Sequence, residues 1–148
     1  MTTHVRKQIR DAAITALTGL TTTGANVKNS PVYPMQDADL PGLRVFTRNE
    51  SSQHLEMGST RARERSLELY VEACVKATSA STDTVDLIAK EVEIALDANN
   101  TLGGLCKYIE PRGFEEDLDG SGEKPVAIGR LKFEVVYHTR KGSPDVAA

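Results

Sequence analysis

Residues 61–77 read Arg-Ala-Arg-Glu-Arg-Ser-Leu-Glu-Leu-Tyr-Val-Glu-Ala-Cys-Val-Lys-Ala, and the other elements are predicted from their relation to this segment. Apolar side chains occupy every second position from Leu67 to Val75, while Glu68 and Glu72 occupy alternate positions. This alternation is typical of a strand with one buried face. A helix would instead place the two glutamates one turn apart as like charges. We therefore predict a long strand with one face against a core and the other toward water or a partner.

The composition is that of an ordinary globular domain. A chain of 148 residues suits one domain with a single hydrophobic core. The formal net charge of -3 predicts no general affinity for nucleic acid or for an anionic membrane surface. No run of about 18 apolar residues is present, so we expect no membrane span and a protein made in a cytoplasm. Cys74 and Cys106 lack the spacing of a metal site, and both are expected to be reduced thiols without a role.

Two amphipathic helices flank the central strand in the sequence. The first is predicted to begin with Thr3 as its N-cap and to end near residues 19–20. The second follows N-cap candidates at residues 79–82, has Asp83 in its first turn, and is predicted to end in left-handed geometry at residues 99–100. The side chains expected to face the core are Val5, Ile9, Ala12, Ala13, Ala16, Leu17 and Leu20 in the first helix and Val85, Ile88, Ala89, Val92, Ala95 and Leu96 in the second.

Further strands are predicted before and after this segment. Residues 27–34 contain two prolines and suit only the edge of a sheet. Residues 43–48 alternate again and are predicted to pair antiparallel with the central strand. The polar residues 49–60 between them are expected to project as an exposed loop.

The C-terminal part completes the predicted sheet. Residues 105–116 and 126–140 are predicted as strands joined by a Gly-rich turn, and residues 141–148 as a disordered tail. The fold class is therefore predicted as α+β, with a mostly antiparallel twisted β-sheet of four to five strands and two α-helices packed on one face. We expect a single domain over residues 1–140.

The outward faces of the two long strands have opposite charges. The last strand is basic at alternate positions, including Arg130 and Lys132, where the central strand is acidic. If the two strands are neighbours, these charges pair across the sheet, each pair contributing roughly 0.2–1 kcal/mol. We expect either a subunit interface or a solvated sheet face, and the candidate interface residues are Arg44, Arg48, Glu64, Glu68, Glu72, Arg130 and Lys132. Glu68→Lys together with Glu72→Lys is expected to impair assembly and to leave the fold intact.

No catalytic or cofactor motif is recognised. Residues 117–123 resemble the start of a calcium-binding loop, but the twelfth position is Ile128, where a bidentate carboxylate is required. Gly103 and Gly104 lack the lysine and the strand-to-helix setting of a phosphate loop. We expect no cofactor, no metal and no enzymatic activity.

The order of elements and several short phrases resemble the tail terminator and related tail-completion proteins of long-tailed bacteriophages. The phrases are the Pro-Val-Tyr-Pro at residues 31–34, Leu-Pro-Gly-Leu-Arg-Val-Phe-Thr at residues 40–47, and Arg-Ser-Leu-Glu-Leu-Tyr-Val-Glu at residues 65–72. The resemblance extends from the first helix to the final strand and covers nearly the whole chain.

This resemblance implies a structural virion protein that forms a homo-oligomeric ring, expected to be hexameric, at the head-proximal end of the tail. The ring would cap the tail tube, stop its polymerisation, bind the tail tube protein and the head-tail connector protein, and let DNA pass without specific binding. Assembly would take place in the host cytoplasm. Two alternatives remain. One is another phage neck or head-tail connector protein. The other is a small α+β enzyme or ligand-binding domain that uses His54, Cys74 or Cys106, and a pocket with convergent polar groups would favour it.

Overall fold

The computed structural model describes residues 3–30, 37–55, 61–119 and 125–148, and it confirms the α+β class with two α-helices. The sheet has six strands and is mixed, whereas four to five mostly antiparallel strands were predicted. In chain order the elements are α1 (Val5–Leu17), β1 (Val27–Lys28), the short 3-10 helix η1 (Asp37–Asp39), β2 (Gly42–His54), β3 (Ala62–Lys76), α2 (Ser81–Ala98), β4 (Tyr108–Asp119), β5 (Val126–Arg140) and β6 (Ser143–Ala147).

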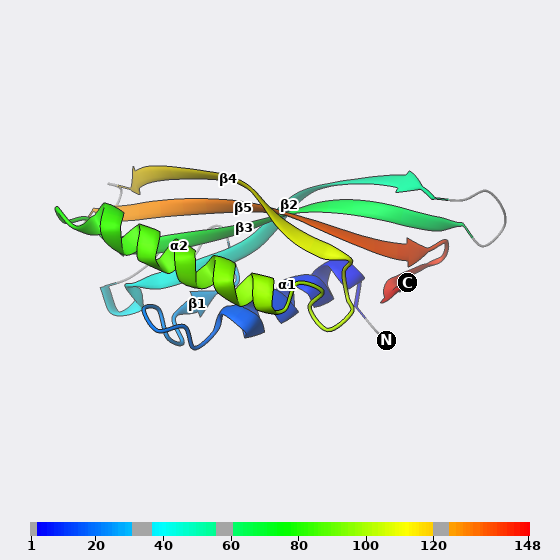
Figure 1. Ribbon diagram of the computed structural model, residues 1–148, viewed down its shortest axis with the longest axis horizontal. Coiled ribbons are helices and arrows are strands. Elements are labelled where there is room, and N and C mark those ends of the chain that lie inside the picture. Colours follow the sequence, from blue (N-terminus) through cyan, green and yellow to red (C-terminus); the bar gives the residue numbers. More distant parts are fainter. Residues whose placement is uncertain (1–2, 31–36, 56–60, 120–124) are drawn as a thin grey trace.

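The strands lie in the order β1-β2-β3-β5-β4, and β6 pairs with β5 off this path (Figure 1). Strands β3 and β5 form the centre of the sheet and pair antiparallel along their whole length. The predicted antiparallel pairing of residues 43–48 with the central strand is confirmed. The predicted edge position of the Pro-containing segment is confirmed for β1, which pairs with β2 in parallel through Val27 and Lys28 alone. Residues 31–36 of that segment lie outside the described residues.

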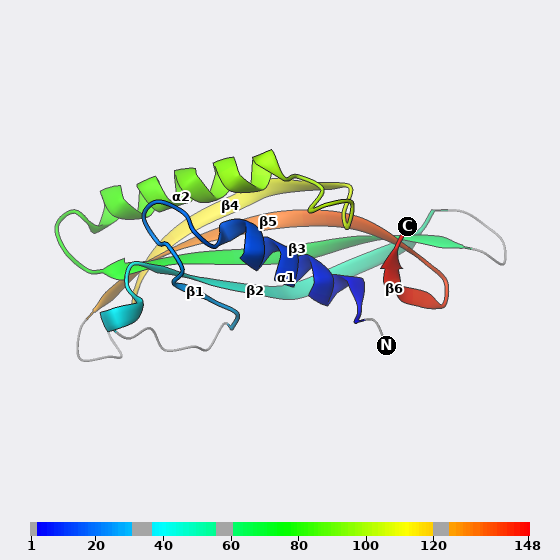
Figure 2. The same cartoon turned by 90° about the horizontal axis from the view of Figure 1, so that it is seen from below.

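Both helices cover one face of the sheet (Figure 2), as the sequence predicted. Each helix buries residues three or four positions apart, as expected for an amphipathic helix on a core. The sheet contributes alternate residues of β2, β3 and β5 to the same core. The fully buried helix residues are Val5, Ile9, Ala13 and Leu17 from α1 and Ile88 and Val92 from α2.

The helix ends differ from the prediction in detail. His4, not Thr3, caps α1, because its Nδ1 atom accepts a hydrogen bond from the Arg6 backbone N–H. Helix α2 begins after Ala80 without a side-chain cap, although Asp83 does lie in its first turn. It ends at Asn99, whose φ of -132° is not left-handed, so that prediction is wrong.

Strand β2 extends six residues beyond the predicted end, through part of the segment expected to be a loop. A β-bulge lies between Thr47 and Glu50, because three steps along β2 there match two steps along β3. The bulge interrupts the alternation, and the residues that follow it are polar, so the strand signal is lost. Residues 56–60 lie outside the described residues.

The C-terminal residues 143–147 form strand β6, whereas the sequence predicted a disordered tail. β6 pairs with β5 beside the far ends of β2 and β3. These strand ends project beyond both helices on the right of Figure 1. We refer to residues 51–55, 61–66 and 136–141 as the arm.

Candidate assembly surface

A row of alternating charges crosses the open face of the sheet, which is the face opposite the helices. Arg44, Glu72, Arg130 and Glu115 lie directly opposite one another on β2, β3, β5 and β4. The Glu72 carboxylate lies 2.9 Å from an Arg44 nitrogen and 2.8 Å from Arg130 Nε. Arg130 also lies 3.2 Å from Glu115. The row joins the four strands through side chains as well as through backbone hydrogen bonds.

Next to this row lies a mixed aromatic and charged cluster. The rings of Phe46 and Tyr70 stack with centroids 5.4 Å apart, and the guanidinium of Arg48 lies over both rings. Lys132 Nζ lies 3.1 Å from the Glu68 carboxylate. Hydrogen bonding from Asn49, and then from Lys132, lowers the pKa of Glu68, so its carboxylate remains ionised at neutral pH.

Six of the seven predicted interface residues thus belong to one continuous patch. The predicted pairing across the sheet is confirmed for Glu72 with Arg130 and for Glu68 with Lys132. Glu64 lies apart from the others on the arm, where it is 3.3 Å from His138. Whether the patch contacts another subunit stays a prediction.

The surroundings of Glu72 argue against the expectation that Glu68→Lys together with Glu72→Lys leaves the fold intact. The Glu72 side chain is only 3% exposed and lies between two arginines. A lysine at this position would place three cations together in a site with little water, which costs far more than a surface substitution. Glu68 is 24% exposed and remains a suitable position for a surface charge reversal.

No pattern in the sequence indicates a second polar cluster, which lies at the base of the arm. The bulge places Glu50 on the helix-covered face of the sheet. There its carboxylate lies 2.8 Å from Arg6 and 3.2 Å from Arg65. Glu50 also accepts a hydrogen bond from the hydroxyl of Tyr137. Burial, together with the charge and hydrogen bond of Glu50, raises the pKa of Tyr137, so its hydroxyl stays a donor. This cluster fixes the arm to α1.

His4 borders this cluster at the start of α1. Burial, and then the positive charges of Arg6 and Arg65, lower the pKa of His4. The neutral imidazole is therefore favoured, and only that form can accept the capping hydrogen bond at Nδ1. The positive charges of Arg6 and Arg65 thus favour the neutral form of His4 that caps the helix.

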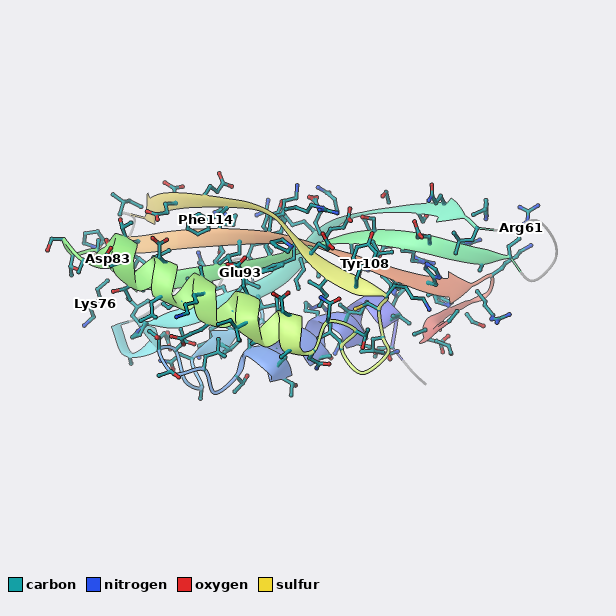
Figure 3. The ribbon with its side chains drawn as sticks, viewed as in Figure 1. Arg61, Lys76, Asp83, Glu93, Tyr108 and Phe114 are labelled. Atoms are coloured by element: carbon teal, nitrogen blue, oxygen red, sulfur yellow. The ribbon has the colours of Figure 1, made fainter. Side chains whose placement is uncertain are left out.

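Strand β4 forms one edge of the sheet and, with α2, borders a recess of about 500 Å³. Phe114 of β4 is 46% exposed, although it lies on the helix-covered side of the sheet. Figure 3 labels Phe114 on β4 and Glu93 on α2, the two elements that border this recess. A second recess of about 400 Å³ lies further along the same elements, beside Leu118. We refer to the two recesses together as the α2–β4 groove.

The residues of the enzyme alternative do not come together. Cys74 pairs with Gly42 at one end of β2, and His54 lies at the other end, about 40 Å away at roughly 3.3 Å per residue. Burial raises the pKa of the Cys106 thiol to about 11, which keeps it protonated and poorly nucleophilic at neutral pH. Among the residues that the structure describes, no group of three or more His, Cys, Asp or Glu side chains is arranged to hold a metal.

Comparison with known proteins gives no family assignment. No protein-family model matches the chain, and a search of curated proteins finds no significant match. In the described part of the chain, no helix has the length and apolar character needed to cross a membrane.

Proposed function

We propose that the protein is a structural virion protein, a tail terminator that forms a ring on the tail tube of a long-tailed bacteriophage. The ring stops tube polymerisation and offers a joining surface to the head-tail connector. The expected number of subunits is six, and DNA passes through the ring without specific binding. The proposal starts from the resemblance in element order and in the three short phrases described above.

The open edges of the sheet are the observation that best supports this proposal. Among the residues that the structure describes, β4 ends the strand order on one side, and on the other side β1 covers only the Leu43 and Arg44 positions of β2. Unpaired backbone groups at such edges are suited to strand pairing with another chain. Because the two edges differ in sequence, a contact between them is heterologous, and heterologous contacts generate closed rings when the rotation closes.

The test is the mass of the purified protein in solution, measured by light scattering over a range of concentration and salt, with negative-stain images of the same samples. Six copies of 16.1 kDa give about 97 kDa, and ring-shaped particles are expected in the images. The same measurement is repeated with tail tubes built from the tube protein of the same virus. Rings in solution, or recruitment of monomers to tube ends, support the proposal. A protein that stays monomeric and does not bind the tubes at any concentration contradicts the proposal.

The alternative of a neck or head-tail connector protein makes a different prediction in the same assay. Such a protein forms a ring but binds the portal side of the joint, so it does not shorten or cap free tubes. Tube length measured in the presence of the protein separates the two functions. A capping protein reduces mean tube length in proportion to its concentration, and a connector leaves it unchanged.

A further inference from the structure

The arm and strand β4 have net charges of opposite sign. The arm has Arg61, Arg63, Arg65, Arg140 and Lys141. Even when Glu64 and the neighbouring Glu56 are counted against them, its net charge is +3. Strand β4 has five acidic residues and one arginine, Arg112, a net charge of -4. In Figure 1 the arm projects to the right, and β4 runs to the left end of the sheet.

Arg65 is already paired with Glu50, but the other four arm cations are available for an external partner. Arg61, Arg63, Arg140 and Lys141 make no ion pair with any residue that the structure describes. Figure 3 shows Arg61 at the end of β3 farthest from Lys76. Leu55, at the described end of the β2 side of the arm, is 45% exposed. The arm therefore presents an apolar side chain beside several cations.

The α2–β4 groove has the complementary character. Its surface combines apolar residues with carboxylates and one lysine, and among its residues are Asp86, Lys90, Glu93, Phe114 and Leu131. Leu118, on the same side of β4, is 67% exposed. Glu116 and Asp117 are exposed carboxylates of β4 that make no ion pair with a described residue. The outer backbone edge of β4 lies beside these side chains.

We propose that the arm of one copy lies in the α2–β4 groove of a second copy. This inference rests on the proposed ring function and names the surfaces that would join its subunits. Charge complementarity favours this pairing, and the acidic residues of β4 oppose pairing of two β4 edges with each other. An open assembly of copies has one free arm at one end and one free groove at the other, so association continues until a ring closes. The charge row on the open face then has an intramolecular role.

The test uses two charge-reversed variants. The arm variant has Arg61→Glu with Arg63→Glu, and the groove variant has Glu116→Arg with Asp117→Arg. A control with Lys7→Glu and Lys76→Glu matches the charge change of the arm variant outside both regions. Thermal melts followed by circular dichroism establish that each variant is folded. Particle mass is measured by light scattering.

Each variant alone is expected to lose assembly, with an apparent association constant lowered about tenfold or more, while the control assembles like the wild type. A mixture of the two variants in equal amounts is expected to regain rings in which the variants alternate, because the intact arm pairs with the intact groove and the charge-reversed arm pairs with the charge-reversed groove. A chain that combines all four substitutions is expected to regain rings.

The outcomes separate this inference from the proposed function. Rings formed equally well by the wild type and by both variants overturn the arm-to-groove contact and leave the ring function standing. If the wild type assembles only on tail tubes, the variants are compared by their recruitment to tube ends, with equal recruitment again overturning the contact. A wild type that associates neither in solution nor on tubes overturns both.

Discussion

Glu72 is charged, lies on the sheet face that the helices leave uncovered, and is nevertheless almost inaccessible to solvent. Arg44 and Arg130 lie on either side of it and neutralise it from both neighbouring strands. The alternation in the sequence predicted correctly that Glu72 points away from the core. The alternation does not predict which residues of the neighbouring strands lie beside Glu72, because that depends on the register of the strands.

We expect Glu72→Ala to destabilise the fold much more than Glu68→Ala. Removing one member of a buried charge cluster leaves uncompensated charge and costs about 3–5 kcal/mol. Loss of the partly exposed Glu68 pair costs about 1 kcal/mol or less. Urea unfolding at concentrations where the chain is monomeric measures both free energies. Equal losses of unfolding free energy in the two variants would contradict the stronger role that its burial gives to Glu72.

Glu50 illustrates what the sequence cannot predict at this scale. The sequence predicted that acidic side chains of β3 and basic side chains of β5 share one face, because this follows from simple alternation. The particular pairs depend on register: Arg130 lies directly opposite Glu72, whereas Lys132 lies opposite Tyr70 and reaches Glu68 diagonally. Glu50 faces Arg6 and Tyr137 only because a bulge shifts the phase of β2. No residue type marks that bulge in the sequence.

At the scale of the elements, α2 packs closely against β5 at Gly129, and one added methyl group tests this contact. A Cβ atom at Gly129 would lie 2.2 Å from Cγ1 of Val85, closer than real Cβ atoms approach a neighbour. Glycine at this position therefore sets how closely the helix approaches the sheet.

Gly129→Ala is expected to cost about 1–3 kcal/mol, because the helix must shift or Val85 must leave its rotamer. Gly113→Ala on β4 serves as the control, since nothing lies within 4 Å of its added Cβ, and its effect should stay within about 0.5 kcal/mol. A double-mutant cycle with Val85→Ala measures the coupling by urea unfolding. Additive effects would show that the clash is not the cause of the loss.

The elements that the sequence predicted well are those with an unbroken period. α1, α2, β5 and the part of β3 from Leu67 onward keep one spacing of apolar residues, so their type and face follow directly. The outer part of β2 and the whole of β6 lack that signal. Their residues are mostly polar or small, and they are held as strands by pairing with β3 and β5.

The whole molecule is elongated, with the cationic arm at one end and the acidic β4 edge toward the other (Figures 1 and 2). Such a distribution of charge favours head-to-tail association over side-by-side association of identical copies. It also makes association sensitive to salt, because the charges concerned lie at the surface.

We expect the mass in solution to fall as salt increases. From about 0.1 M to about 1 M ionic strength the Debye length shortens from about 10 Å to about 3 Å, which weakens attraction between exposed charges. The melting temperature of the monomeric arm variant should change much less, because Arg44 and Glu72 in its charge row are buried and poorly screened. Light scattering and thermal melts across this range test both statements. A mass that rises with salt would instead indicate an apolar contact.

The bulge in β2 determines where a single-residue deletion can be tolerated. If one residue between Thr47 and Glu50 were deleted, only the extra residue of the bulge would be lost, and Glu50 would stay opposite Leu67 on the face of Arg6 and Tyr137. A deletion further along β2, within the arm, would instead move the residues beyond it to the opposite faces of the sheet. Deletions at these two neighbouring places should therefore differ sharply in their effect, even though both segments are polar and exposed.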